Sequence, residues 1–160
     1  MAEDNDITLP YLARHCDVFY IGGTKIGALC GEAVVFTNRK AHKHFFSIQK
    51  QHGAVIAKGA LIGLQFDALF TDNLYFKLSE HAIRMAMRMK NLFKQKGFEF
   101  YVDSPTNQQF VIMENEKVDQ LSQKVKFTHF GQTDHYHTIC RFVTSWATTE
   151  EELDELKALL

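Results

Sequence analysis

The stretch that decides the fold is DVFYIGGTKIGALCGEAVVF, residues 17–36. Its first apolar run, DVFYI, predicts a strand buried on both faces, and GEAVVF predicts a second short strand. The intervening GGTKIG is typical of a turn, yet it carries a charged amine, Lys25, where Asn or Asp would serve as well. Two interpretations stay open at this point. Lys25 is either a solvated turn residue, or a lysine held at the end of a buried strand, where desolvation and neighbouring cations make an amine nucleophilic toward a carbonyl.

Helical patterns flank this stretch. Residues 7–16 predict a short helix with Thr8 as N-cap and Pro10 in the first turn. Residues 41–70 have helical spacing broken by three glycines, which indicates either two helices with a break or a close approach of backbones. A cap signal at 71–73 then begins a long helix that ends at Gly97, and its methionine stripe is typical of a packed core.

The last third alternates strands and helices. Strands are predicted, with a turn at 105–107, over 98–104, 108–114, 126–131 and 136–146. Asn115 is the predicted cap of one helix, with Val118, Leu121 and Val125 on its apolar face. A capping box, Thr148 with Glu151 or Thr149 with Glu152, predicts a C-terminal helix.

Arg141 is the second charged residue in an unexpected place. On the strand TICRFVTSW it shares a face with Ile139 and Val143, both β-branched and apolar. A guanidinium there is either the partner of a nearby acid in a structural salt bridge or a two-pronged clamp for a substrate carboxylate.

Composition narrows the class of protein. The chain has 160 residues, 46% of them hydrophobic and 23% charged, which predicts a packed core. A net charge of −1 gives no electrostatic reason to expect nucleic acid or an anionic membrane as partner. No window approaches the roughly 18 apolar residues of a membrane span, and the acidic start MAEDNDITLP is unlike a signal peptide, so a cytoplasmic location is expected. Cys16, Cys30 and Cys140 sit in apolar runs and are expected to be buried, reduced thiols.

Two kinds of site are excluded by spacing. GGTKIG lacks the Gly-x4-Gly-Lys-Ser/Thr pattern of a phosphate loop, and the chain contains no GxGxxG. The histidine groups, His42 with His44 and His135 with His137 and Cys140, are not completed by a carboxylate or a second cysteine, so no metal site is expected.

Three segments together resemble the threonine aldolase / aromatic amino acid β-eliminating lyase family. They are residues 17–36, KQHGAVIAKGALIGLQF (50–66) and CRFVTSWATTEEELDEL (140–156), and the resemblance runs from Thr8 onward. It implies an α/β fold, the C-terminal part of an aspartate-aminotransferase-like enzyme that uses pyridoxal 5'-phosphate (PLP). Residues 1–70 would then be the end of the PLP-binding large domain, and 71–160 a small α+β domain.

The resemblance also implies roles for particular residues. Lys25 matches the lysine that carries PLP covalently and shuttles a proton, and Arg141 matches the arginine that binds the α-carboxylate of an amino acid substrate. The Thr24 hydroxyl, beside Lys25, is expected from its own chemistry to donate to the cofactor phosphate. The resemblance implies that Lys58 lies in a helix that approaches the cofactor of a neighbouring subunit. The implied reaction is Cα–Cβ cleavage of a β-hydroxy amino acid or a β-elimination, with group transfer on the same fold as a third outcome. The implied assembly is a homodimer or tetramer.

One departure from the family is large. Its members carry a long segment before the lysine, with a Gly-rich phosphate loop, a ring-stacking side chain and an Asp that pairs with the pyridine nitrogen. Lys25 stands near the start of this chain, and Asp4, Asp6 and Asp17 do not match that motif. The expectation is therefore a fragment that is nearly inactive by itself. The alternative is a non-catalytic α/β module, or a subunit whose apolar strands assemble with a partner.

Overall fold

The computed structural model describes residues 7–38, 41 and 43–160. Its contacts divide these residues into two units, one reaching to Lys77 and the other Leu78–Leu160. Each unit is described by itself. The division falls inside one long helix, α4 (Leu74–Gln95), whereas the predicted domain boundary at 70/71 lies just before that helix. The assignment of the two parts to a large and a small domain stays a prediction. Asp4, Asp6 and His42, which the sequence analysis considered, lie outside the described residues.

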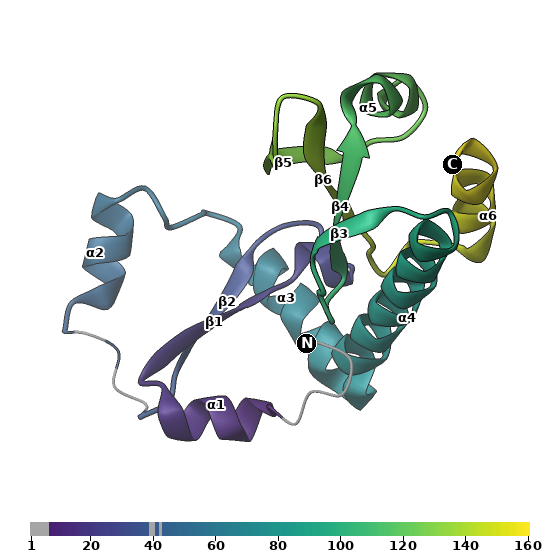
Figure 1. The fold of residues 1–160 in the computed structure, drawn as a ribbon. Coiled ribbons are helices and arrows are strands. Elements are labelled where there is room, and N and C mark those ends of the chain that lie inside the picture. Colours follow the sequence, from purple (N-terminus) through teal and green to yellow (C-terminus); the bar gives the residue numbers. More distant parts are fainter. Residues whose placement is uncertain (1–6, 39–40, 42) are drawn as a thin grey trace. The chain divides into compact units, whose positions relative to one another are not determined.

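The N-terminal unit is built from short elements (Figure 1). In chain order they are α1 (Leu9–His15), β1 (Val18–Gly22), the 3-10 turn η1 (Thr24–Ile26), β2 (Glu32–Phe36), α2 (Phe45–Gln51), α3 (Gly59–Phe70) and η2 (Thr71–Asn73), followed by the first turn of α4. The predicted cap of α1 is confirmed, because the Thr8 side chain accepts a hydrogen bond from the Tyr11 amide. The predicted strand-turn-strand arrangement around Lys25 is confirmed as well.

The expected burial of the first strand on both faces is wrong for these residues. β1 and β2 form a two-stranded antiparallel sheet in which Tyr20 pairs with Val34. On the face that these two share with Val18, the exposed fractions are 50% for Val18, 70% for Tyr20 and 52% for Val34. A continuous apolar run indicates burial only when elements cover both faces of the strand, and the described residues cover one face at most.

The glycine-broken segment 41–70 is two helices with a break between them. α2 ends at Gln51, and Gly53 follows with φ of 68°, a left-handed value that favours glycine. Gly59 is the first residue of α3. The break is thus explained by the position of the first two glycines, and Gly63 lies within α3 with open space around it.

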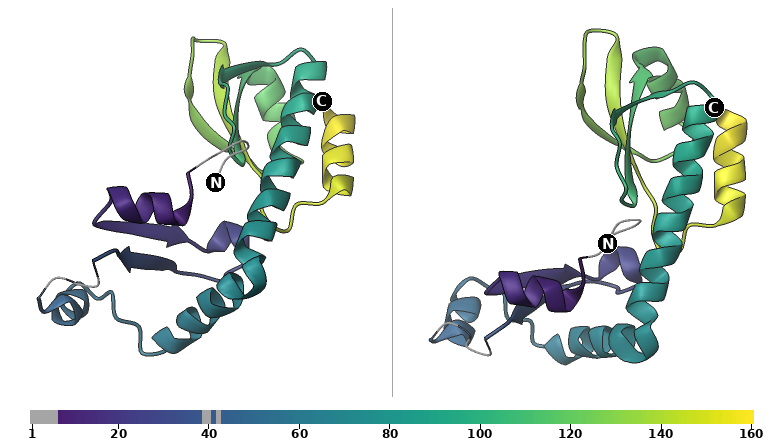
Figure 2. Two further views of the ribbon diagram at one scale, coloured as in Figure 1. Left: turned by 90° about the horizontal axis from the view of Figure 1, so that it is seen from below. Right: turned by 60° about the horizontal axis from the view of Figure 1, so that its bottom comes forward.

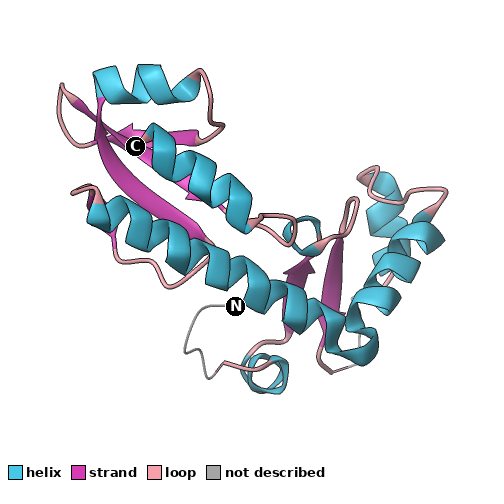
Figure 3. Ribbon diagram, turned by 90° about the vertical axis from the view of Figure 1, so that its right-hand side faces the viewer, coloured by secondary structure: helices cyan, strands magenta, loops and turns pink. Residues whose placement is uncertain are grey.

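The C-terminal unit is an antiparallel sheet with helices packed on one face. Its strands β3 (Glu99–Val102), β4 (Gln108–Glu114), β5 (Thr128–Gln132) and β6 (His137–Val143) lie in the order β3-β4-β6-β5, so β6 is internal. All neighbouring strands are antiparallel. The helices are the remainder of α4, α5 (Asn115–Ser122) and α6 (Glu150–Leu159). Figures 2 and 3 show α6 running beside the C-terminal half of α4 along this sheet.

The core of this unit joins all three helices to β4 and β6. Its fully buried members include Met85 and Phe93 of α4, both 0% exposed, and Val111 and Cys140 of the sheet, also 0% exposed. The prediction that the methionine stripe is core is confirmed. Phe93 packs its ring 4.8 Å from that of Phe142. The side chains that face away from the helices, Arg141 among them, are therefore on the more open face of the sheet.

Helix caps in this unit were predicted with mixed success. α6 uses the second of the two predicted capping boxes: the Thr149 side chain accepts from the Glu152 amide, and the Glu152 side chain accepts from the Thr149 amide. Asn115 is not the cap of α5. Its amide group instead donates to the His135 carbonyl and its Oδ1 accepts from the Thr138 hydroxyl, which fastens the start of α5 to the last hairpin.

Burial of the cysteines was predicted correctly at one position of three. All three thiols are free. Cys140 is buried, Cys16 is half-buried and Cys30 is exposed in the loop that follows η1, so an apolar run did not guarantee burial there. Within the described part of the chain, no helix is long and apolar enough to cross a membrane.

Candidate functional site

The loop that carries Lys25 is closed by its own backbone. The Gly23 carbonyl accepts hydrogen bonds from the amides of Ile26 and Ala28, each at 3.0 Å. The turn η1 lies between these bonds, and Gly27 ends it with φ of 101°. Because one carbonyl accepts two hydrogen bonds, the path of the backbone is fixed on both sides of Lys25. The lysine therefore lies in an ordered turn.

Two glycines allow this loop to pack closely on its surroundings. A Cβ on Gly23 would come within 2.7 Å of the Ala28 Cβ and 2.9 Å of the Phe66 ring. A Cβ on Gly31 would come within 2.7 Å of Ile62, and its φ of 92° favours glycine. Because Ile62 and Phe66 belong to α3, the loop rests against that helix through backbone that has no room for a side chain.

Two further side chains hold the ends of the loop. The Tyr75 hydroxyl of α4 donates to the Gly22 carbonyl at 3.1 Å. The Gln65 Oε1 of α3 accepts from the Leu29 amide at 2.6 Å. Partial burial raises the pKa of the Tyr75 hydroxyl, which keeps it a proton donor over a wide pH range. Sequence reasoning missed both residues, since neither sits in a recognisable motif and each acts over more than 35 positions of the chain.

The predicted cofactor residues lie in this same unit. Thr24 and Lys25 are neighbours on η1, and both side chains are exposed. Lys58 is exposed as well and is the residue before the first turn of α3. The loop touches α3 further along, at Ile62 and Phe66. Among the described residues, no hydrogen bond or ion pair joins Lys58 to Thr24 or Lys25. Thr24 and Lys25 are thus consecutive residues of one turn, and Lys58 directly precedes the helix on which their loop packs.

Arg141 lies in the C-terminal unit, on the central strand β6. Its cross-strand neighbours are Phe110 of β4 and Thr128 of β5. One guanidinium nitrogen donates to the Gln108 Oε1 and another to the Thr128 hydroxyl, each at 3.4 Å. The aromatic rings of Phe110 and Phe130 lie close by and meet edge to face at 4.9 Å. Gln108 and Thr128 were also missed from sequence, because strand register is needed to find them.

The guanidinium of Arg141 is poorly satisfied. Its two hydrogen bonds are long and go to neutral acceptors, and its Nε is buried without a partner. No acidic side chain pairs with it among the described residues. The ion pairs found there involve Arg88, Lys90 and His137 instead. The alternative of a structural salt bridge thus finds no support within the described chain. An unpaired cation with a free, buried N–H is the arrangement that an incoming carboxylate would complete.

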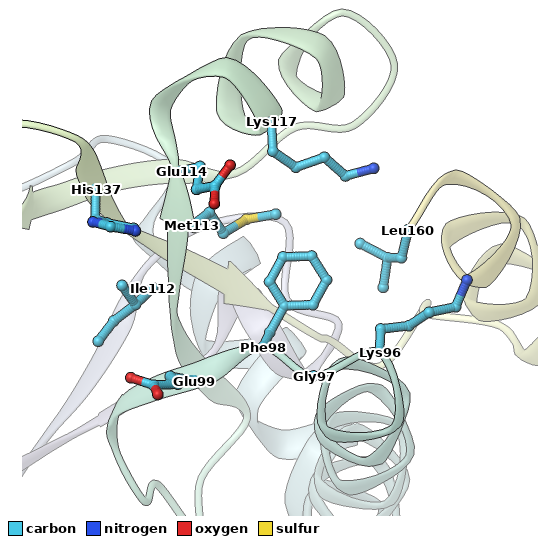
Figure 4. A pocket seen from close by; sticks show the side chains of 10 residues that line it. All are labelled: Lys96, Gly97, Phe98, Glu99, Ile112, Met113, Glu114, Lys117, His137 and Leu160. Carbon is cyan, nitrogen blue, oxygen red and sulfur yellow. The ribbon is translucent and has the colours of Figure 1, made fainter.

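A separate pocket of about 440 Å³ lies between the end of α4, β4 and the start of α5. Figure 4 shows amines of Lys96 and Lys117 and the carboxylates of Glu99 and Glu114 around the ring of Phe98. The amine of Lys117 is already bonded to the Leu159 carbonyl at 2.9 Å. The pocket contains neither Lys25 nor Arg141, so it is distinct from both predicted positions. In the described ranges no group of three or more His, Cys, Asp or Glu side chains is arranged to hold a metal ion.

Comparison with known proteins gives a consistent set of relatives. No protein-family profile matches the chain. A low specificity L-threonine aldolase from a Pseudomonas species is 30% identical over 145 residues, which is 89% of this chain and 40% of that protein. The Pseudomonas aeruginosa enzyme of the same name is 27% identical over 143 residues, 88% of this chain and 40% of the relative. The chain thus spans 40% of the length of these curated relatives.

Solved structures agree with the sequence relatives. The threonine aldolase of Leishmania major superposes with a TM-score of 0.91 at 36% identity, over 99% of this chain and 46% of that one. Serine palmitoyltransferase of Sphingomonas wittichii superposes with a TM-score of 0.67 at 10% identity, over 99% of this chain and 42% of its own. A serine palmitoyltransferase structure with a PLP internal aldimine gives 0.60 at 14% identity, covering 92% and 39%. The last two show the fold alone.

Proposed function

The chain belongs to the threonine aldolase family of PLP-dependent enzymes, whose C-terminal part it matches, and on that premise we propose that it supplies residues to an amino acid lyase site. The reaction class is Cα–Cβ cleavage of a β-hydroxy amino acid, or the related β-elimination. The observation that carries the proposal is the ordered loop around Lys25: an exposed amine stands on a turn whose backbone is bonded on both sides.

The residues present fit PLP at the point of covalent attachment. Lys25 offers an exposed primary amine to the cofactor's aldehyde carbon, and Thr24 offers a neighbouring exposed hydroxyl to its phosphate. Lys58 is assigned to a helix that approaches the cofactor of a neighbouring subunit. PLP, when bound, accepts electrons as a bond at the substrate Cα or Cβ breaks.

Two residues of the chain would act on the amino acid. Arg141 binds its α-carboxylate through the fork of N–H donors that Gln108 and Thr128 satisfy only weakly, and so orients the bond that breaks. Lys25, once its amine is free, holds and moves a proton at the substrate Cα. A group that pairs with the pyridine nitrogen is absent from this set of residues. We therefore propose that the catalytic site also needs residues from the part of the aldolases that this chain does not match, and that the chain is nearly inactive by itself.

The test uses covalent labelling of the whole chain. PLP is added at low concentration, the adduct is fixed with borohydride, and labelled lysines are mapped by mass spectrometry. Lys25 should be labelled in preference to Lys50, an exposed lysine of α2, and Lys25→Ala should lose that label alone. Equal labelling of Lys25 and Lys50 would overturn the assignment. Threonine cleavage by the chain alone, abolished in Lys25→Ala, would overturn the claim that the site is incomplete.

A second candidate, a non-catalytic module that assembles with a partner, is favoured by one observation. The face of β1 and β2 that carries Val18, Tyr20 and Val34 is apolar and exposed, and such a face commonly marks an interface. The homodimer or tetramer, and the cytoplasmic location, that we propose for the enzyme are compatible with a contact through the same face. Light scattering tests whether this face is a contact: a Tyr20→Lys variant should reduce the mass of the oligomer, and an unchanged mass would argue against this face.

A further inference from the structure

The loop that carries Lys25 has its two ends fixed by side chains from two different helices. At one end the Tyr75 hydroxyl of α4 donates to the Gly22 carbonyl at 3.1 Å, and at the other the Gln65 Oε1 of α3 accepts from the Leu29 amide at 2.6 Å. Between these points, the Gly23 carbonyl closes the turn. The segment 22–29 is thus held at three places, and Lys25 lies near its middle.

Each of the two side chains is itself held in place. The Gln65 amide nitrogen donates to the Leu61 carbonyl at 3.2 Å, so the direction of its Oε1 is set by its own helix. The Tyr75 ring stacks on Phe70 at 5.0 Å with an interplanar angle of 12°. Asp72 adopts left-handed backbone values between these two rings, with φ of 50°, and this sharp turn from α3 into α4 brings Tyr75 to the loop.

We propose that Gln65 and Tyr75 are positioning residues for Lys25, which act by fixing the backbone from which its amine projects. The inference rests on the proposed function of Lys25. An amine on a fixed backbone loses less conformational freedom when it forms a covalent bond, so the bond forms more favourably. Neither residue is assigned a contact with cofactor or substrate, and the packing of the loop on Phe66 and Ile62 does not depend on their polar atoms.

Tyr75→Phe removes only the hydroxyl, whereas Gln65→Leu removes both polar atoms of its side chain, the Oε1 that accepts from Leu29 and the amide nitrogen that donates to Leu61. Tyr75→Phe keeps the ring that stacks on Phe70, and Gln65→Leu keeps a side chain of similar size without the acceptor. Gln65→Glu retains an oxygen that can accept from the Leu29 amide and loses only the bond to the Leu61 carbonyl, so it serves as the conservative rescue. Matched controls make the same chemical change at side chains that form no hydrogen bond with another described residue: Tyr20→Phe on β1 and Gln51→Leu at the end of α2.

The first measurement is amide hydrogen exchange of the full chain. Tyr75→Phe and Gln65→Leu should each speed exchange in peptides covering 22–31, with the core peptides of the C-terminal unit unchanged. The Tyr20→Phe and Gln51→Leu controls should leave 22–31 as in the parent chain. Unchanged exchange in this segment for both variants would overturn the inference, because the two bonds would then not order the loop.

The second measurement is the labelling of Lys25 relative to Lys50 at low PLP, fixed with borohydride. One neutral hydrogen bond contributes a net 0.5–1.5 kcal/mol, so each variant should lower the Lys25-to-Lys50 ratio by about two- to tenfold, and Gln65→Glu should restore it. If Gln65→Leu kept the parent's Lys25-to-Lys50 labelling ratio, the inference would be wrong. It would also be wrong if Gln65→Glu lowered this ratio as much as Gln65→Leu does. The failures are separable: a parent chain without preference for Lys25 overturns the proposed function, whereas a parent with preference and variants that keep it overturns the positioning role.

Discussion

At the scale of single residues, Arg141 is expected to favour binding of a substrate carboxylate while lowering the stability of the folded chain. Its guanidinium lacks an acidic partner in the described chain and leaves Nε buried and unbonded, which costs free energy in the folded state. Arg141→Met, of similar length and without charge, should therefore leave the free energy of unfolding unchanged or raise it by about 1 kcal/mol, while weakening binding of an amino acid carboxylate. Urea unfolding and a substrate-binding titration measure the two effects.

Arg88 supplies the matched control for that prediction. It is paired with Glu150 and bonded to Asp154 at 2.7 Å, so Arg88→Met loses real partners. The pairs are partly exposed, and the expected loss of stability is about 0.5–1 kcal/mol with carboxylate binding unaffected. If Arg141→Met destabilised the chain more than Arg88→Met, the reading of Arg141 as an unsatisfied cation would be wrong.

Cys140 gives the chain a predictable alkaline response. Burial raises the pKa of its thiol to about 11. The folded pKa lies above the unfolded value near 8.5, so the neutral thiol's contribution is fully present below that value and is lost as pH rises toward 11. By about pH 10.5 the loss should be on the order of 2 kcal/mol. Urea unfolding at several pH values should show a steeper decline for the parent than for Cys140→Ala, and parallel declines would contradict this.

At the scale of elements, the two glycines Gly63 and Gly23 should respond oppositely to the same substitution. Gly63 lies within α3 with no atom within 4 Å of an added Cβ, so Gly63→Ala should stabilise the chain by about 0.5–1 kcal/mol. Gly23→Ala forces a Cβ to 2.7 Å from Ala28 and should cost about 1–3 kcal/mol. Thermal unfolding monitored by helix and strand signals tests both. A gain at Gly23 would mean that the loop is not packed on α3.

Elements were predictable where their signals are local. The capping box of α6 and the left-handed Gly97 after α4 depend on a few neighbouring residues, and both stand where the spacing placed them. Asn115 was misassigned because its side chain finds better partners 20 and 23 positions away, at His135 and Thr138. A cap residue competes with tertiary contacts that spacing cannot reveal.

At the scale of the whole molecule, the sequence indicated the candidate site residues but did not predict which side chains surround them. The family resemblance pointed to Lys25, yet the supports at Gln65 and Tyr75 come from helices 36 and 53 positions from the atoms they bind. The partners of Arg141 likewise required the register of β4 and β5 against β6. Charge and spacing can indicate which side chain is functional, whereas its hydrogen-bond partners depend on contacts between residues far apart in the chain.

The two units should also differ in stability, because their buried apolar content differs. The described buried apolar side chains of the N-terminal unit are Ala28, Phe66 and Leu69, whereas the C-terminal unit has the continuous cluster around Phe93. Phe93→Ala should therefore lower the unfolding free energy of the C-terminal unit by about 3–5 kcal/mol, through lost burial and the cavity that remains.

Phe46→Ala is the control for that change, since Phe46 is 65% exposed on α2 and its truncation should alter stability by less than about 0.5 kcal/mol. Hydrogen exchange resolves where the loss falls. In the parent chain, amides of β4 and β6 should exchange far more slowly than those of β1 and β2, and Phe93→Ala should remove that difference. Slow exchange in β1 and β2 of the parent chain would show that the N-terminal unit has stabilising contacts beyond its small core.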